Sequence, residues 1–180
     1  SKYPAIITKL TYVGDESVQW LLRPGFPAGE GAFTFTYAEG RQNNRVSAAN
    51  PVPPGGLFFE NDPGKGRFKL LGSETRKVMN EAIQAEVEVT FVQVEDQKPN
   101  KKGTVYEIPA SFPMREQAKH IRSDRTAVFT LEALGLNGQE FKIEENTAFS
   151  LPPGGEAKPY KVTVVTPEQV TIEFAGADGK

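Results

Sequence analysis

Short segments in which apolar and polar residues alternate are the feature that most limits what this chain can fold into. In "FTFTY" the apolar side chains at 33, 35 and 37 share one face, and the two threonines occupy the other. "YKVTVV" (160–165) and "VTIEF" (170–174) show the same period of two, which is that of a strand with one buried face. The 17 Gly and 14 Pro residues supply many turns between such segments. The pattern predicts an all-β, antiparallel fold built from short strands.

Two further segments carry finer predictions about the strands. In "AEVEVTFVQVED" (85–96) the apolar residues occupy odd positions up to Phe91 and even positions from Val92. A change of phase inside a strand predicts a β-bulge between these two residues. Near the N-terminus, "AIITKLTYV" and "SVQWLL" are expected to pair as a hairpin that turns at residues 14–16. In the strand at 160–165, alternation places Tyr160, Val162 and Val164 on one face.

Helical signals are few. "PMREQAKHIRS" (113–123) begins with a proline and spaces Met114, Ala118 and Ile121 as a helix would, which predicts one short helix. "SETRKVMNEAIQ" (73–84) fits either a helix or a long hairpin that turns near Asn80, and its position between two strands favours the hairpin.

The motif Pro-Pro-Gly-Gly occurs twice, at 53–56 and 152–155, and each copy precedes an aromatic-Lys-aliphatic strand. Duplication of a β unit and the independent use of two similar turns both remain open. The linker after the first copy contains Leu57, Phe58 and Phe59. These residues either tuck under the sheet as a lid, which is favoured, or form an exposed apolar patch.

The charges exclude some classes of partner. The 21 basic and 23 acidic residues nearly cancel and are interspersed, so no overall field attracts nucleic acid or a membrane surface. Cysteine is absent, which excludes disulfides and thiolate chemistry. No apolar run approaches the roughly 20 residues of a transmembrane helix.

No residue is predicted to be catalytic, and neither a metal nor a cofactor is expected. The single histidine, His120, lacks a nucleophile or metal ligands at a useful spacing and is interpreted as a surface residue among basic neighbours. The acidic pairs 15–16, 95–96 and 144–145 are interpreted as solvated charges beside turns. Acids from distant segments could still converge in a hydrolase cleft, which leaves that class open.

Carbohydrate binding is the alternative from a different class. Such a site would need exposed aromatic side chains on a sheet. Trp20 alternates with Val18 and Leu22 as a core residue would, and the tyrosines at 12, 37, 106 and 160 lie in expected strands.

Three stretches carry a resemblance: "QKPNKKGTVYEIP", "DRTAVFTLEALGLNGQEFKIEENTAFSLPPGG" and "PYKVTVVTPEQVTIEF". Together they resemble small β-rich envelope proteins of mucin-degrading gut bacteria of the Verrucomicrobia, which include an immunoglobulin-like protein encoded with a type IV pilus-like cluster. The last stretch is also similar in rhythm to the small periplasmic β domains that align pilus and type II secretion machinery. The resemblance covers roughly the C-terminal half and brings no catalytic motif.

The resemblance implies an antiparallel immunoglobulin-like β-sandwich without enzymatic activity. We expect one β-rich domain over 1–180, with one short helix, a sub-lobe boundary near 115–125 and an elaborated second lobe left open. The expected role is structural or adhesive, in the bacterial periplasm or outer membrane after removal of a signal or anchor segment. Expected partners are pilus or outer-membrane proteins or a second copy of the chain, but not nucleic acid. The predicted interaction surface consists of Leu57, Phe58, Phe59, Val170, Ile172 and Phe174.

Overall fold

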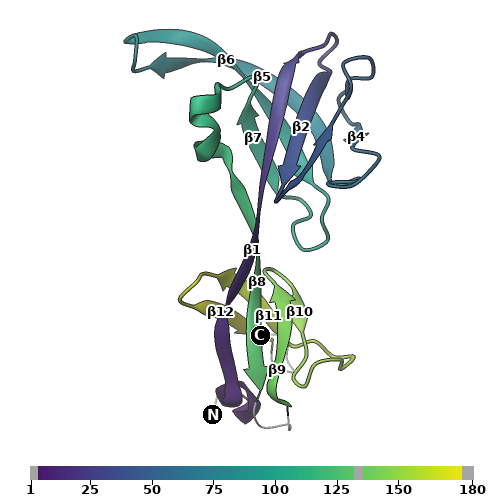
Figure 1. Ribbon diagram of the computed structural model, residues 1–180, viewed down its shortest axis with the longest axis vertical. Coiled ribbons are helices and arrows are strands. Elements are labelled where there is room, and N and C mark those ends of the chain that lie inside the picture. The colour runs from purple at the N-terminus through teal and green to yellow at the C-terminus, as the bar shows by residue number, and fades with distance from the viewer. Residues whose placement is uncertain (1–3, 132–135, 176–180) are drawn as a thin grey trace. The chain divides into compact units, whose positions relative to one another are not determined.

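The computed structural model describes residues 4–131 and 136–175, and the predicted all-β, antiparallel, sandwich-like fold is confirmed (Figure 1). The strands are β1 (Leu10–Pro27), β2 (Phe33–Glu39), β3 (Gln42–Arg45), β4 (Leu57–Phe58), β5 (Phe68–Asn80), β6 (Ala85–Asp96), β7 (Val105–Pro109), β8 (Arg122–Leu131), β9 (Leu136–Glu144), β10 (Ala148–Phe149), β11 (Tyr160–Val165) and β12 (Val170–Phe174). Two short 3-10 helices, η1 (Ala5–Lys9) and η2 (Met114–His120), complete the described elements. The helix predicted over 113–123 is η2, and Pro113 is its N-cap.

The chain forms two compact units. One combines residues 1–18 with 123–180, and the other is continuous from Gln19 to Arg122. The chain therefore passes between the units twice, between residues 18 and 19 and between residues 122 and 123.

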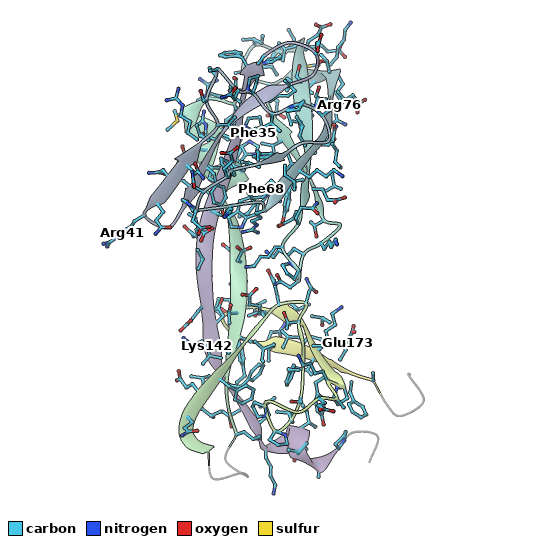
Figure 2. All side chains as sticks on the ribbon, turned by 90° about the vertical axis from the view of Figure 1, so that its right-hand side faces the viewer. Phe35, Arg41, Phe68, Arg76, Lys142 and Glu173 are labelled. Carbon is cyan, nitrogen blue, oxygen red and sulfur yellow. The ribbon has the colours of Figure 1, made fainter. Side chains whose placement is uncertain are left out.

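The unit of residues 19–122 has a large aromatic core between two sheets, whose strand orders are β3-β2-β1 and β4-β5-β6-β7. The alternation in "FTFTY" acts as predicted, because the side chains at 33, 35 and 37 are all buried. Trp20 is buried as expected and contacts Phe68 and Tyr106. Figure 2 shows Phe35 and Phe68 inside this unit. Burial of such large apolar side chains is the main favourable term in folding.

In the other unit, the strands β1-β8-β9 and the separate sheet β10-β11-β12 enclose a second core. Phe129, Phe149 and Tyr160 are buried in its core, and β12 packs against them. One predicted core residue is wrong: Val164 is 46% exposed, and Val165 is buried instead. The register of β11 shifts between Val162 and Val164, so a bulge at this point reverses the alternation.

The predicted N-terminal hairpin is also wrong. Strand β1 runs without reversal through residues 14–16. Asp15 and Glu16 are not turn residues there; their carboxylates pair with Arg125 at 2.7 Å and Lys142 at 2.8 Å. These ion pairs link β1 to β8 and β9, with which it shares a sheet.

Residues 73–84 form the long hairpin that the sequence favoured. Strands β5 and β6 pair continuously from Gly72↔Gln93 to Asn80↔Ala85. The bulge predicted between Phe91 and Val92 is wrong, because β6 keeps its register with β7 across these residues. The irregularity lies in β5, at Leu71, where the register shifts between Leu70 and Gly72.

The two Pro-Pro-Gly-Gly turns occupy different places in their units. The first precedes β4, whereas the second follows β10. What the units share is a two-residue strand, a long loop and then a longer strand, with Phe58 paired to Phe68 in one unit and Phe149 paired to Tyr160 in the other. The similarity therefore aligns residues 57–70 with 148–162 and does not align the turns.

A buried ion pair joins the loop before β5 to the end of β6. The Arg67 guanidinium donates from Nε to Asp96 Oδ1 at 3.1 Å and from Nη2 to Oδ2 at 2.9 Å. Asp96 is fully buried and also accepts from the Tyr106 hydroxyl at 2.6 Å and from the backbone N–H of Lys98 at 3.0 Å. Arg67 lies over the Trp20 ring, 4.6 Å from its centroid. Asp96 is thus not the solvated charge that the sequence suggested, because this carboxylate has partners for both oxygens.

Replacing Arg67 with Met is expected to lower the free energy of unfolding by about 3–5 kcal/mol, because it leaves the Asp96 carboxylate buried without its counter-ion. Urea unfolding followed by Trp20 fluorescence measures this unit specifically, since Trp20 is the only tryptophan. The control is Arg76→Met, which removes an exposed ion pair with Glu107 and should cost less than about 1 kcal/mol. Equal losses in the two variants would contradict this account.

Candidate functional site

The first predicted contact surface is not a contiguous patch. Phe58 and Phe59 are buried, and Phe58 stacks on Phe35 with ring centroids 4.1 Å apart. Leu57 alone is exposed, at 61%. The lid interpretation therefore holds, and the proposal of Phe58 and Phe59 as contact residues is corrected, because both rings face the core.

The second predicted surface lies on β12, where the side chains and the backbone edge differ in what they offer to a partner. Val170, Ile172 and Phe174 pack against the core of their own unit, so these side chains are not offered to a partner. The outward residues of β12 are Thr171 and Glu173. Strand β12 nevertheless ends its sheet in the described structure, with β11 on one side only. Its backbone edge, and not its apolar side chains, is the feature available for recognition.

A more prominent feature is the outer part of the β5–β6 hairpin, residues 73–90, which we call the ribbon. Figure 1 shows this hairpin extending past β2 and β7. Strand β4 pairs with β5 only at Phe68 and Lys69, and β7 pairs with β6 only from Phe91 to Glu95. Within the described residues, the two strands of the ribbon therefore have only each other as strand partners. Apart from the Thr90 carbonyl, which accepts from the backbone N–H of Ala110 at 2.8 Å, its outer edges present backbone groups that a further strand could use.

Apolar side chains accompany these open edges. Val78 and Val87 form a cross-strand pair on the face opposite the core, and Val89 lies on the same face. Near the tip, Met79 and Ile83 are 57% and 61% exposed. Val78 is 37% exposed, and Met79 beside it points to the opposite face, so the outer ribbon exposes apolar side chains on both faces. Apolar side chains that gather in an exposed region can mark an interaction site.

Where the ribbon joins the sheet, the Arg76 side chain covers part of the apolar face that carries Val78, Val87 and Val89. The Arg76 guanidinium lies 4.1 Å from the centroid of the Phe91 ring and pairs with Glu107 of β7. Phe91 is thereby partly covered, while Val78 and Val87 further out have no such cover from Arg76. The ribbon thus divides into a base attached to the sheet and an outer part that is open.

The sequence carries a signal for the point where the ribbon begins. The shift from odd to even apolar positions at Phe91 and Val92 marks the point where β6 leaves the core. Val92 and Val94 point inward, and the preceding odd residues point to the opposite face. The change of phase therefore reflects a change in which face is apolar, and not an inserted residue.

No group of three or more Asp, Glu or His residues is placed to hold a metal ion in the part of the chain that the structure describes. His120 lies between the basic residues Lys119 and Arg122 and is partly buried against Phe112, with ring centroids 4.3 Å apart. No helix in the described residues is long and apolar enough to cross a membrane.

Comparisons with models of protein families, with curated proteins and with solved structures found no match. The geometry of the described residues therefore carries the functional argument.

Replacing His120 with Gln is expected to reduce the loss of stability in mild acid. Burial lowers the pKa of His120, Glu116 opposes this shift, and Arg122 adds to it. Because the folded-state pKa is lowered, the neutral form contributes stability above the unfolded value of about 6.5, and this contribution is lost as the pH falls through the folded pKa. Urea unfolding at about pH 7.5 and pH 5 measures the difference. An unchanged pH dependence in the variant would rule out this role.

Proposed function

We propose that this protein is a non-enzymatic interaction protein that binds a protein partner through the ribbon. The observation that carries the proposal is the combination of two open strand edges with exposed Val78, Met79 and Ile83 on one protruding hairpin. Either feature alone occurs on ordinary surfaces, but together they match what strand addition requires.

The physical basis is that a two-stranded ribbon is marginally stable in water. A partner strand that pairs along β5 or β6 would satisfy the unpaired backbone groups at that edge. It would also cover apolar side chains such as Val78 and Val87, which adds hydrophobic free energy of association. Backbone pairing would supply affinity, and the alternate side chains would supply selectivity.

The proposed setting is the bacterial cell envelope, and the proposed partners are pilus or outer-membrane proteins. This rests on the resemblance of residues 97–109, 124–155 and 159–174 to envelope proteins associated with type IV pili. An immunoglobulin-like assignment of the sandwich and an adhesive role belong to the same proposal. A second copy of the chain is the alternative occupant of the ribbon.

The carbohydrate-binding alternative has less support from the aromatic residues. Trp20, Tyr37, Tyr106 and Tyr160 are buried, so they do not form an exposed stacking platform for a sugar. The geometry of these four side chains favours protein contact over glycan stacking as the principal function.

The test compares two triple variants matched for exposure. Val78, Met79 and Ile83 are replaced by Ser in the ribbon variant, and Leu57, Val105 and Val164 are replaced by Ser in the control. The immobilised chain is used to capture proteins from a bacterial envelope extract. The ribbon variant is expected to retain at least tenfold less of the partner captured by the wild type, since loss of three apolar contacts exceeds the 1.4 kcal/mol that a tenfold change requires.

The control variant should retain that partner as the wild type does, and circular dichroism should show that both variants are folded. Equal capture by the wild type and the ribbon variant would refute binding through the ribbon. A glycan array run beside the capture tests the alternative class. Strong glycan binding without any protein partner would overturn the proposed function.

A further inference from the structure

A groove that contains two arginine side chains crosses the face of the β1-β2-β3 sheet that points away from the core of the 19–122 unit. It consists of two adjoining hollows of about 760 and 450 Å³. Both hollows are lined by Arg23, Thr36 and Arg45. The larger volume lies within the range of sites that hold small molecules.

The strand register explains why these three residues meet. Arg23 of β1 is directly opposite Thr36 of β2, and Thr36 is directly opposite Arg45 of β3. Directly opposed residues share a face, so one row carries two guanidinium groups with a hydroxyl between them. Because neighbouring strands are about 4.8 Å apart, the two arginine backbones are separated by roughly 10 Å.

Arg23 is held in place from the side of η2. Its Nη2 donates to the backbone oxygen of Phe112 at 2.8 Å, and its guanidinium carbon lies 4.5 Å from the centroid of the Phe112 ring. Its Nη1 contacts Met114 Sδ at 2.8 Å and Gln117 Oε1 at 3.5 Å. These contacts occupy three of its five N–H donors and leave two for a ligand.

Arg45 differs because its guanidinium has no ion pair or hydrogen bond with any described residue. Neither hollow is lined by an acidic side chain in the described structure. Glu60 lines a neighbouring hollow together with Arg45, but the two residues form no ion pair. The groove therefore concentrates positive charge that no described carboxylate neutralises.

The floor of the groove is kept open by Gly25. A Cβ at this position would collide with the Thr34 hydroxyl, which lines the second hollow beside Thr36. Glycine therefore leaves room for the Thr34 side chain on the floor of the groove, where the hydroxyls of Thr34 and Thr36 can bond to a ligand.

From this arrangement we infer that the groove binds a small ligand through an oxyanion group, which is a carboxylate, a sulfate or a phosphate. Such a group would lie over Thr36 and accept hydrogen bonds from Arg23 and Arg45. Guanidinium groups bind planar and tetrahedral oxyanions through paired N–H donors, and these charge-assisted bonds are stronger than neutral ones. The amides of Asn43 and Gln117 beside the row can bond to hydroxyl groups on the rest of the ligand.

The test titrates the full chain with glucose 6-sulfate, glucose and sodium sulfate at constant ionic strength, and follows the backbone amide signals by NMR. Glucose 6-sulfate is expected to shift the signals of Thr36 and Arg45, and glucose is not. If sodium sulfate binds as tightly, the oxyanion alone is recognised. If it binds more weakly, the saccharide contributes as well, and both results support an oxyanion site.

The decisive variant is Arg45→Gln, which removes an exposed side chain and should leave the fold intact. It is expected to weaken binding at least tenfold, since a charge-assisted hydrogen bond is lost. The matched control is Arg41→Gln at the β2–β3 turn, where Figure 2 shows Arg41 projecting away from the unit. Equal weakening by both variants would overturn the inference, since the effect would then be one of total charge. The inference would also be overturned if neither glucose 6-sulfate nor sodium sulfate bound.

Discussion

The contact between Arg67 and Asp96 is the interaction on which the 19–122 unit depends. It places a charged pair inside an aromatic core, where each charge needs the other. Asp96 ends β6, and Arg67 ends the loop that carries the buried Phe59. The pair thereby fixes where β6 stops and where the loop closes. The same carboxylate binds the hydroxyl of Tyr106 on β7, so three chain segments converge on it. Their convergence defines the closed end of the sheet from which the ribbon extends.

The ribbon differs from this closed end in how many of its polar groups have partners. Around Asp96 every oxygen of the carboxylate has a partner, whereas the ribbon's strands pair only with each other in the described structure. A rigid core with a solvated hairpin suits a protein whose surface is completed by another molecule. The oxyanion groove lies on a different sheet of the same unit and relies on a different force, which is charge. Protein contact and anion binding can therefore be altered separately, by changes at Val78 or at Arg45.

Much of the fold could be predicted because the alternation of apolar and polar residues along a strand indicates which side chains are buried. The faces of β2 and β12 follow from period two alone. Trp20 is buried as predicted, but Val18 of the same alternation is 46% exposed and Leu21 is buried, so the period does not hold along that part of β1. The failures have local causes. Alternation at Val164 is reversed by a bulge that one sequence does not reveal. Residues 14–16 stay extended inside a sheet whose neighbouring strand, β8, comes from far along the chain. No residue near Asp96 in the sequence indicates that it pairs with Arg67. From the sequence alone, this buried ion pair therefore looks the same as a solvated charge. The sequence predicts the hairpin of the ribbon but not that its outer part lacks neighbouring strands, and it does not predict the groove, since both features depend on which strands lie side by side.

Amide hydrogen exchange of the free protein tests most directly whether the ribbon stands outside the packed core with open edges. The account predicts that amides in residues 75–79 and 86–89 exchange orders of magnitude faster than those of Leu70, Val92 and Val94, because local opening of the ribbon disrupts no core contact. Protection of the ribbon equal to that of these core residues would contradict the account. It would mean that the ribbon is already covered in the free protein and is not available to a partner.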